Sequence, residues 1–171
     1  FLERSNPDKS LQEAIKKLEK NPGNADALSA IPILYKDILA SHLANINAAR
    51  ARAAKNISLW DKIINEYEQL QKAYNRIINS TAAFTLVNPQ NFSTELFEAK
   101  DSASLHYYNA GNNLLDSKSR TELKKAYNYF EKADKITPGY KDAKEKMKEA
   151  FENATVIAVI NPIRDNSFFN R

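Results

Sequence analysis

The chain has 171 residues, of which 43% are hydrophobic and 27% are charged, and its formal net charge is +4. This length and balance indicate one folded domain or a short repeat array, and they exclude an intrinsically disordered chain. With three glycines and no cysteine, the sequence offers no glycine-rich phosphate loop, disulfide, thiolate metal site or cysteine nucleophile. Lysine, glutamate, alanine and leucine are abundant, which favours a mostly helical fold.

The N-terminal region has the three-and-four spacing of apolar residues that is typical of an amphipathic helix. A first helix is predicted to begin near Pro7, with Ser5 or Asn6 as its cap, and to end at the turn formed by residues 21–24. Proline and glycine in that turn cannot continue a helix.

A second helical pattern begins after Asn24, which is its predicted cap, and continues to Ala53. Pro32 lies inside this pattern. Because proline lacks a backbone N–H, we expect a kink or a break in the helix there.

The middle of the chain contains one further long helix and the longest segment without periodicity. The helix is predicted at 59–79, with Ser58 as its cap. The segment 80–92 follows, and Ser93 is predicted to cap the next helix.

Three more helices are predicted, at 94–115, 121–136 and 139–153. The stretch 154–163 is instead rich in β-branched residues and ends in proline, which favours a strand. Since nothing else in the chain could pair with it, we expect an extended tail over 154–171 or the first strand of a further domain.

Two of these predicted helices carry small and aromatic residues at regular steps. Gly111 lies among aromatic residues in the first, and Ala126, Phe130 and Ala133 share one face of the second, which Pro138 ends. The small residues would let the two helices approach closely, and Phe130 would fill the space between them.

This arrangement, over residues 102–140, resembles the tetratricopeptide repeat (TPR), a helix-turn-helix unit of about 34 residues. The tryptophan, leucine, glycine and tyrosine places of the repeat correspond here to Tyr107, Ala110, Gly111 and Leu114. The spacing from Gly111 to Ala126 is three residues longer than the family pattern, and the excess falls in the polar loop 116–121. The segment after Gly139 resembles the helix that follows the last repeat in such proteins.

The resemblance implies a right-handed α-solenoid of antiparallel helical hairpins over 1–153, and a scaffold for protein–protein interaction. In such proteins the first helix of each hairpin lines a concave groove that binds a peptide. The corresponding residues here are Leu105, Tyr108, Asn112 and Asp116. Chaperone-binding members use an asparagine at the place of Asn112 to hold a carboxylate, but Tyr108 replaces the lysine they also need, so no carboxylate clamp is predicted.

Earlier segments match the repeat less closely. Trp60, Ile63 and Tyr67 follow the first-helix pattern, and Leu28, Ile31 and Tyr35 follow it 32 residues earlier. These segments are either degenerate repeats or ordinary amphipathic helices. The general organisation also resembles repeat-bearing envelope lipoproteins of Bacteroidetes-type bacteria, which implies a periplasmic or envelope location and a lipid anchor upstream of Phe1, with the cytoplasm as the alternative.

No pattern predicts catalysis, a cofactor or a metal site. His42 and His106 lie in different helices without ligand-spaced partners, and each is expected to be a partly exposed or hydrogen-bonded helix residue. Carboxylate pairs such as Glu66 and Glu68, or Glu95 and Glu98, are common on helix surfaces and carry no acid–base signal alone. The sequence therefore favours a non-enzymatic protein.

Two alternatives to protein binding remain open. Residues 41–59 contain Arg50, Arg52 and Lys55 but no acid, and with the lysine-rich helices at 121–136 and 139–153 they could form a nucleic-acid surface. Cations that complement a helix C-terminus would give the same pattern. A small-ligand pocket could instead lie between the helices at 59–79 and 94–115, under the 80–92 segment.

Overall fold

The computed structural model describes residues 6–155, and this part of the chain is all-α, as predicted, with no strand. Its seven helices are α1 (Pro7–Lys20), α2 (Ala25–Ala53), α3 (Leu59–Ile78), α4 (Thr81–Phe84), α5 (Ser93–Leu115), α6 (Arg120–Ile136) and α7 (Ala143–Ala154). The six long helices agree with the predicted segments, whereas the single turn α4 was not predicted.

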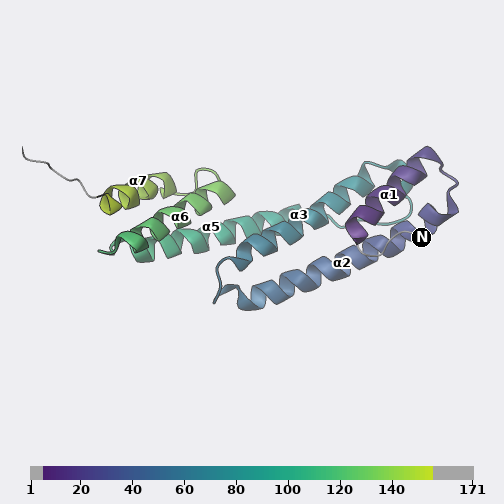
Figure 1. Cartoon of the computed structure of the whole chain (residues 1–171). Coiled ribbons are helices and arrows are strands. Elements are labelled where there is room, and N and C mark those ends of the chain that lie inside the picture. Colours follow the sequence, from purple (N-terminus) through teal and green to yellow (C-terminus); the bar gives the residue numbers. More distant parts are fainter. Residues whose placement is uncertain (1–5, 156–171) are drawn as a thin grey trace, which may run out of the picture.

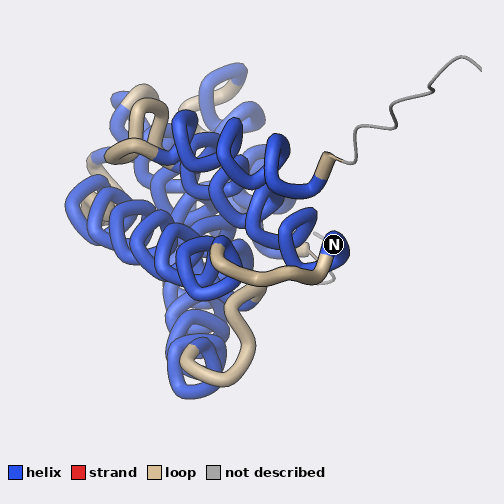
Figure 2. The backbone as a smooth tube through the Cα atoms, turned by 90° about the vertical axis from the view of Figure 1, so that its left-hand side faces the viewer, coloured by secondary structure: helices blue, strands red, loops and turns tan. Residues whose placement is uncertain are grey.

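The long helices lie side by side in an elongated arrangement, with α1 to α3 toward one end and α6 and α7 at the other (Figure 1). Each packs mainly against its neighbours along the chain: α1 on α2, α2 on α3, α3 on α5, α5 on α6 and α6 on α7. Figure 2 shows the connecting loops at the ends of these helices. The long helix α5 joins the two ends of the molecule because it contacts both α3 and α6.

The first two helices begin where asparagine side chains cap them. The Oδ1 atom of Asn6 accepts a hydrogen bond from the Lys9 amide at 3.1 Å, and that of Asn24 accepts one from the Ala27 amide at 2.9 Å. Each satisfies an N–H that has no partner within the helix. The Asn24 cap is confirmed as predicted, and of the two predicted alternatives for the first helix, Ser5 and Asn6, the cap is Asn6.

Pro32 does not break α2, which is continuous from Ala25 to Ala53. Of the predicted kink or break, the break is therefore wrong. Ile31, Leu34 and Tyr35, on either side of the proline, are buried in the core, so packing holds the helix together across the missing hydrogen bond.

The serines expected to cap α3 and α5 do not do so. Ser58 occupies the cap position of α3, but its hydroxyl donates to Oδ1 of Asn56 at 2.7 Å. Ser93 is already the first helical residue of α5, and Phe92 precedes it at the cap position. The start of α5 is set by Phe92, whose side chain is buried and whose amide donates to Oε1 of Gln71 at 2.9 Å.

The segment between α3 and α5 is fixed against the core. Its Ala83 is fully buried, and the Gln90 amide donates to the Tyr35 hydroxyl at 2.7 Å. Leu86 and Val87 pack on the same core. The segment is therefore held in place by packing on the core and by this hydrogen bond.

The last helix begins later than predicted, at Ala143 instead of residue 139. Gly139 has φ of 77° and Lys141 has φ of 47°, and these left-handed conformations prevent an α-helix from starting before them. Ala154 still belongs to α7, so the predicted tail begins at least one residue too early. The strand proposed for 154–163 otherwise lies outside the described residues.

The buried apolar residues form two clusters. The N-terminal cluster extends from Leu11 to Ala103 and is built by α1 to α5. The C-terminal cluster lies among α5, α6 and α7 and consists of Leu115, Ala126, Phe130, Ala143 and Ala150. The described chain thus has two adjoining cores.

Candidate functional site

The four residues predicted to line a groove lie along one face of α5, at spacings of three and four residues. Leu105 is 38% exposed, Tyr108 and Asn112 are half-buried, and Asp116 is exposed at the C-cap. All four therefore lie where solvent reaches them, although Tyr108 is partly covered.

Tyr108 is held by the segment that leads into α7. Its hydroxyl donates to Oδ1 of Asp142 at 2.5 Å, and its ring packs edge-on against Phe130 and Tyr140, with centroid distances of 5.6 and 5.9 Å. The hydrogen bond to Asp142, followed by burial, raises the pKa of Tyr108, and the same bond lowers the pKa of Asp142. Tyr108 is therefore a fixed aromatic surface and not a freely rotating side chain.

The strained turn before α7 completes this surface. The ammonium of Lys141 lies 4.8 Å from the Tyr108 ring centroid and 5.3 Å from that of Tyr140. These cation–π contacts help to hold Lys141 at its positive φ. Lys146, one turn into α7, pairs with Glu149 at 3.1 Å.

We name the set Leu105, Tyr108, Asn112, Asp116, Tyr140 and Lys146 the α5–α7 face. Sequence reasoning found its α5 members but missed Tyr140, Lys146 and the Tyr108–Asp142 bond, because the α7 region lies more than 30 residues away in sequence. One signal could have found the bond: Tyr108 and Asp142 are 34 residues apart, which is the repeat period.

The α5–α7 face rests on the close contact between α5 and α6. A Cβ atom built on Gly111 would lie 2.8 Å from two ring carbons of Phe130, and Phe130 and Ala126 are fully buried. No side chain fits between Gly111 and that ring. The predicted role of Gly111 as a helix contact is confirmed.

His42 bridges three helices, although its sequence neighbours gave no sign of this. Its Nδ1 lies 2.5 Å from Oε2 of Glu66 on α3, and its Nε2 lies 3.1 Å from Oδ2 of Asp8 on α1. The hydrogen bond with Asp8 is the main cause that raises the pKa of His42; burial opposes this effect and the bond with Glu66 adds to it. With both ring nitrogens occupied, His42 fits the expected hydrogen-bonded helix residue.

The remaining candidates for chemistry have structural partners or are isolated. The ring of His106 stacks on Trp60 at a centroid distance of 5.0 Å. Glu68 pairs with Lys100 at 3.0 Å, whereas Glu95 forms no ion pair within the described residues. In residues 6–155 no group of three or more histidine, cysteine or carboxylate side chains is arranged to hold a metal ion.

Some cations of the predicted nucleic-acid surface have partners within the described residues. Arg50 donates to the Tyr67 hydroxyl at 3.2 Å and lies over its ring. In α7, Lys144 and Lys148 face Asp134 and Glu152 at 3.9 and 3.8 Å. Acidic partners beside these lysines reduce the positive potential that nucleic acid requires.

Comparison of the chain with protein-family models, with curated proteins and with solved structures gave no significant match. None of the described helices combines the length and the apolarity that crossing a bilayer requires.

Proposed function

We propose that this chain is a non-enzymatic, TPR-type scaffold for protein–protein interaction. In this proposal the helices form a right-handed α-solenoid, and the α5–α7 face binds an extended peptide of a protein partner. The observation that carries the proposal is the joining of α5 and α7 side chains into one solvent-facing surface, fixed by the Tyr108–Asp142 bond.

The packing supports the repeat-like part of the proposal. Gly111 and Phe130 bring α5 and α6 into direct contact, and α7 packs on α6 and also contacts α5. In this arrangement α5 and α7 become neighbours across the hairpin, as successive first helices do in a helical solenoid.

The chemistry of the face suits an extended peptide. Tyr108 and Tyr140 offer large contact area with little loss of side-chain entropy on binding. Asn112 can donate to and accept from a peptide backbone, and Leu105 offers an apolar contact at the edge. Because Tyr108 is already fixed by Asp142, a bound peptide would not need to order it.

A pull-down with the full chain tests this function. Leu105→Glu places a charge on the face at an exposed position, so the fold should survive while partner recovery falls about tenfold, which corresponds to losing one apolar contact. Phe97→Glu is the matched control, because Phe97 is an exposed apolar residue of the same helix, 71% accessible, outside the face.

The measurement is quantitative mass spectrometry of the captured proteins, with circular dichroism to verify the fold of both variants. At least one protein should be lost with Leu105→Glu and retained with Phe97→Glu. Equal recovery of every captured protein by the two variants would refute the α5–α7 face as the binding surface.

A further inference from the structure

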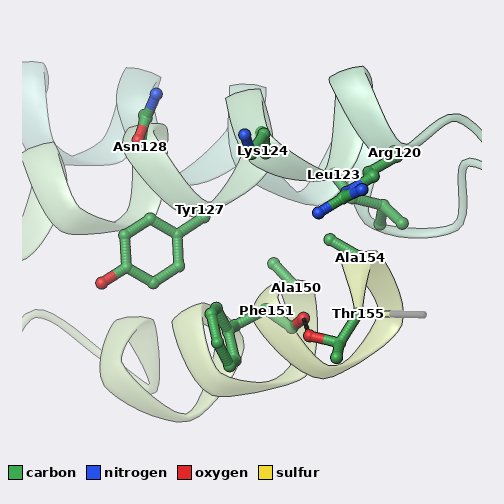
Figure 3. A pocket seen from close by; sticks show the side chains of 9 residues that line it. All are labelled: Arg120, Leu123, Lys124, Tyr127, Asn128, Ala150, Phe151, Ala154 and Thr155. Carbon is green, nitrogen blue, oxygen red and sulfur yellow. Dashed lines mark hydrogen bonds between the residues drawn. The ribbon is translucent and has the colours of Figure 1, made fainter. Parts of the chain in front are cut away.

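A second surface lies between α6 and α7, and it shares no residue with the α5–α7 face. The two helices border a hollow of about 510 Å³. Figure 3 shows Tyr127 of α6 directed toward α7 and Phe151 lying along α7 below it, whereas Asn128 points away from α7. The hollow is lined by Arg120, Leu123, Lys124, Tyr127, Asn128, Ala150, Phe151, Ala154 and Thr155.

The floor of this hollow is apolar, and an aromatic ring at its α7 edge is exposed to solvent. Leu123 and Ala150 are buried at the base, Tyr127 is half-buried, and Phe151 is 62% exposed. A groove between two helices with an apolar base and a protruding ring is the kind of surface that accepts the apolar side of a third helix.

The α6 wall of the groove carries the positive charges of Arg120 and Lys124. Neither Arg120 nor Lys124 forms an ion pair or hydrogen bond within the described part of the chain. Lys118 and Lys125 lie beside them in sequence, and the one nearby acid of α6, Glu122, accepts a hydrogen bond from Ser117.

The α7 wall differs in charge. The residues that line it, Ala150, Phe151, Ala154 and Thr155, carry no charge. The groove is therefore basic along one wall and close to neutral along the other, with apolar residues between. An occupant that complements it must be apolar on one side and acidic on the flank that meets α6.

We propose that the α6–α7 groove is a docking site for an acidic amphipathic helix of a protein partner. Its apolar residues, at spacings of three and four, pack on Leu123, Tyr127 and Phe151. Its carboxylates pair with Arg120 and Lys124, whose side chains have no ionic partner in residues 6–155. This site is separate from the α5–α7 face and holds whether or not that face binds a peptide.

Fluorescence anisotropy with the full chain tests the proposal. The probe is a labelled helical peptide with a leucine stripe flanked by glutamates, and the control probe carries lysines in place of the glutamates. The acidic peptide should bind at least about tenfold more tightly than the basic one, and added salt should weaken the binding.

Two matched pairs of variants locate the site. Lys124→Glu should weaken binding about tenfold or more, whereas Lys135→Glu, on the same helix but outside this groove, should have little effect. Phe151→Gln should weaken binding similarly, whereas Phe97→Gln, another exposed phenylalanine, should not. All four positions are exposed, so the fold should persist, and circular dichroism verifies it.

Several results would overturn the assignment. These are an absence of binding, equal binding of both peptides, or equal effects of Lys124→Glu and Lys135→Glu. Self-association of the chain that Phe151→Gln abolishes would show that a second copy occupies the groove. Peptide binding that appears only after Phe168 and Phe169 are replaced by serine would assign the groove to the chain's own last residues.

Discussion

Gly111 sets the distance between α5 and α6. Its missing side chain leaves room for the Phe130 ring, whose carbons lie 2.8 Å from where a Cβ would be. Phe130 is fully buried and cannot withdraw into solvent. The same ring supports Tyr108 by an edge-on contact, so Gly111 also determines where the α5–α7 face lies.

We expect Gly111→Leu to lower the free energy of unfolding by about 1–3 kcal/mol, because the added side chain overpacks the contact with Phe130. Gly111→Ala should lower the free energy of unfolding by less, since alanine is more favourable than glycine in a helix by up to about 1 kcal/mol. Denaturant unfolding measures both. Asn113→Leu, at an exposed position nearby, is the control and should change stability little.

A double-mutant cycle identifies the contact. If Phe130 is the group that Gly111 accommodates, the cost of Gly111→Ala should shrink in a Phe130→Leu background, because the smaller side chain leaves room. Strict additivity of the two changes, or an unchanged melting temperature for Gly111→Leu, would show that the helices do not meet there.

His42 gives the N-terminal end of the molecule a pH dependence. Its two ring nitrogens face Asp8 of α1 and Glu66 of α3, Asn45 donates to the same Glu66 oxygen, and Arg76 donates to the Asp8 carbonyl. The hydrogen bond with Asp8 is the first cause of the raised pKa of His42. The folded state therefore binds the proton more tightly than the unfolded chain does.

The sign of the effect follows from this. The protonated His42 stabilises the folded state. This stabilisation is fully present at pH below the pKa of histidine in the unfolded chain, about 6.5, and it is lost as the pH rises through the pKa of His42 in the folded state. We expect the melting temperature to fall on raising pH through this window, and His42→Gln to flatten the dependence. His106→Gln should leave it intact; the same flattening by both variants would contradict the role of His42.

At the scale of the elements, the described helices begin for two different reasons. Asparagine caps start α1 and α2, and these signals are local in sequence. The start of α5 is instead fixed by the burial of Phe92 and its bond to Gln71, and that of α7 follows two residues with positive φ.

The caps predict that two substitutions by alanine, at Asn24 and at Ser58, lower the free energy of unfolding by different amounts. Asn24→Ala should lower the free energy of unfolding by about 1 kcal/mol, because the Ala27 amide loses its acceptor. Ser58→Ala should cost less than about 0.5 kcal/mol, because Ser58 makes no capping bond. Thermal unfolding of the two variants provides the comparison, and equal costs would show that Ser58 also caps its helix in solution.

At the scale of the whole molecule, the two hydrophobic clusters meet along α5. The N-terminal cluster includes Ala99 and Ala103 of α5, and the C-terminal cluster includes Leu115 at the other end of the same helix. Because each helix contacts mainly its neighbours, a substitution that destabilises one cluster should lower the local stability of the other cluster less.

Phe130→Ala tests this arrangement. Removing a fully buried phenylalanine costs about 3–5 kcal/mol, and the loss should fall on the C-terminal cluster. Hydrogen exchange followed by mass spectrometry should show reduced protection in α6, α7 and the second half of α5, with α1 and α2 less affected. A uniform loss of protection would instead show that residues 6–155 unfold as one cooperative unit.

The all-α class and the approximate helix positions could be predicted because they depend on local signals. The spacing of apolar residues, the two asparagine caps and the residues that end helices act within a few positions of the chain. The close contact at Gly111 and Phe130 was predictable for a related reason, since small and aromatic residues recur at regular spacing along the two neighbouring helices. The residues on α5 that belong to the α5–α7 face were predicted only through the resemblance to the repeat.

The other features depended on contacts between distant segments. Packing on both sides of Pro32 keeps α2 continuous, and Phe92 replaces Ser93 as the residue that fixes the start of α5. His42 lies 34 residues from Asp8 and 24 from Glu66, so no local pattern could indicate their meeting. Only the folded chain brings Arg120 and Lys124 of α6 beside the exposed Phe151 of α7.

By itself, the sequence determined that this protein is a series of amphipathic helices with one closely packed, repeat-like hairpin. The tertiary structure decided which faces of those helices remain open and which side chains from separate helices share them. The physical reason is that helix formation depends on neighbours three and four positions away, whereas a binding surface depends on which distant segments are brought together by burying apolar area.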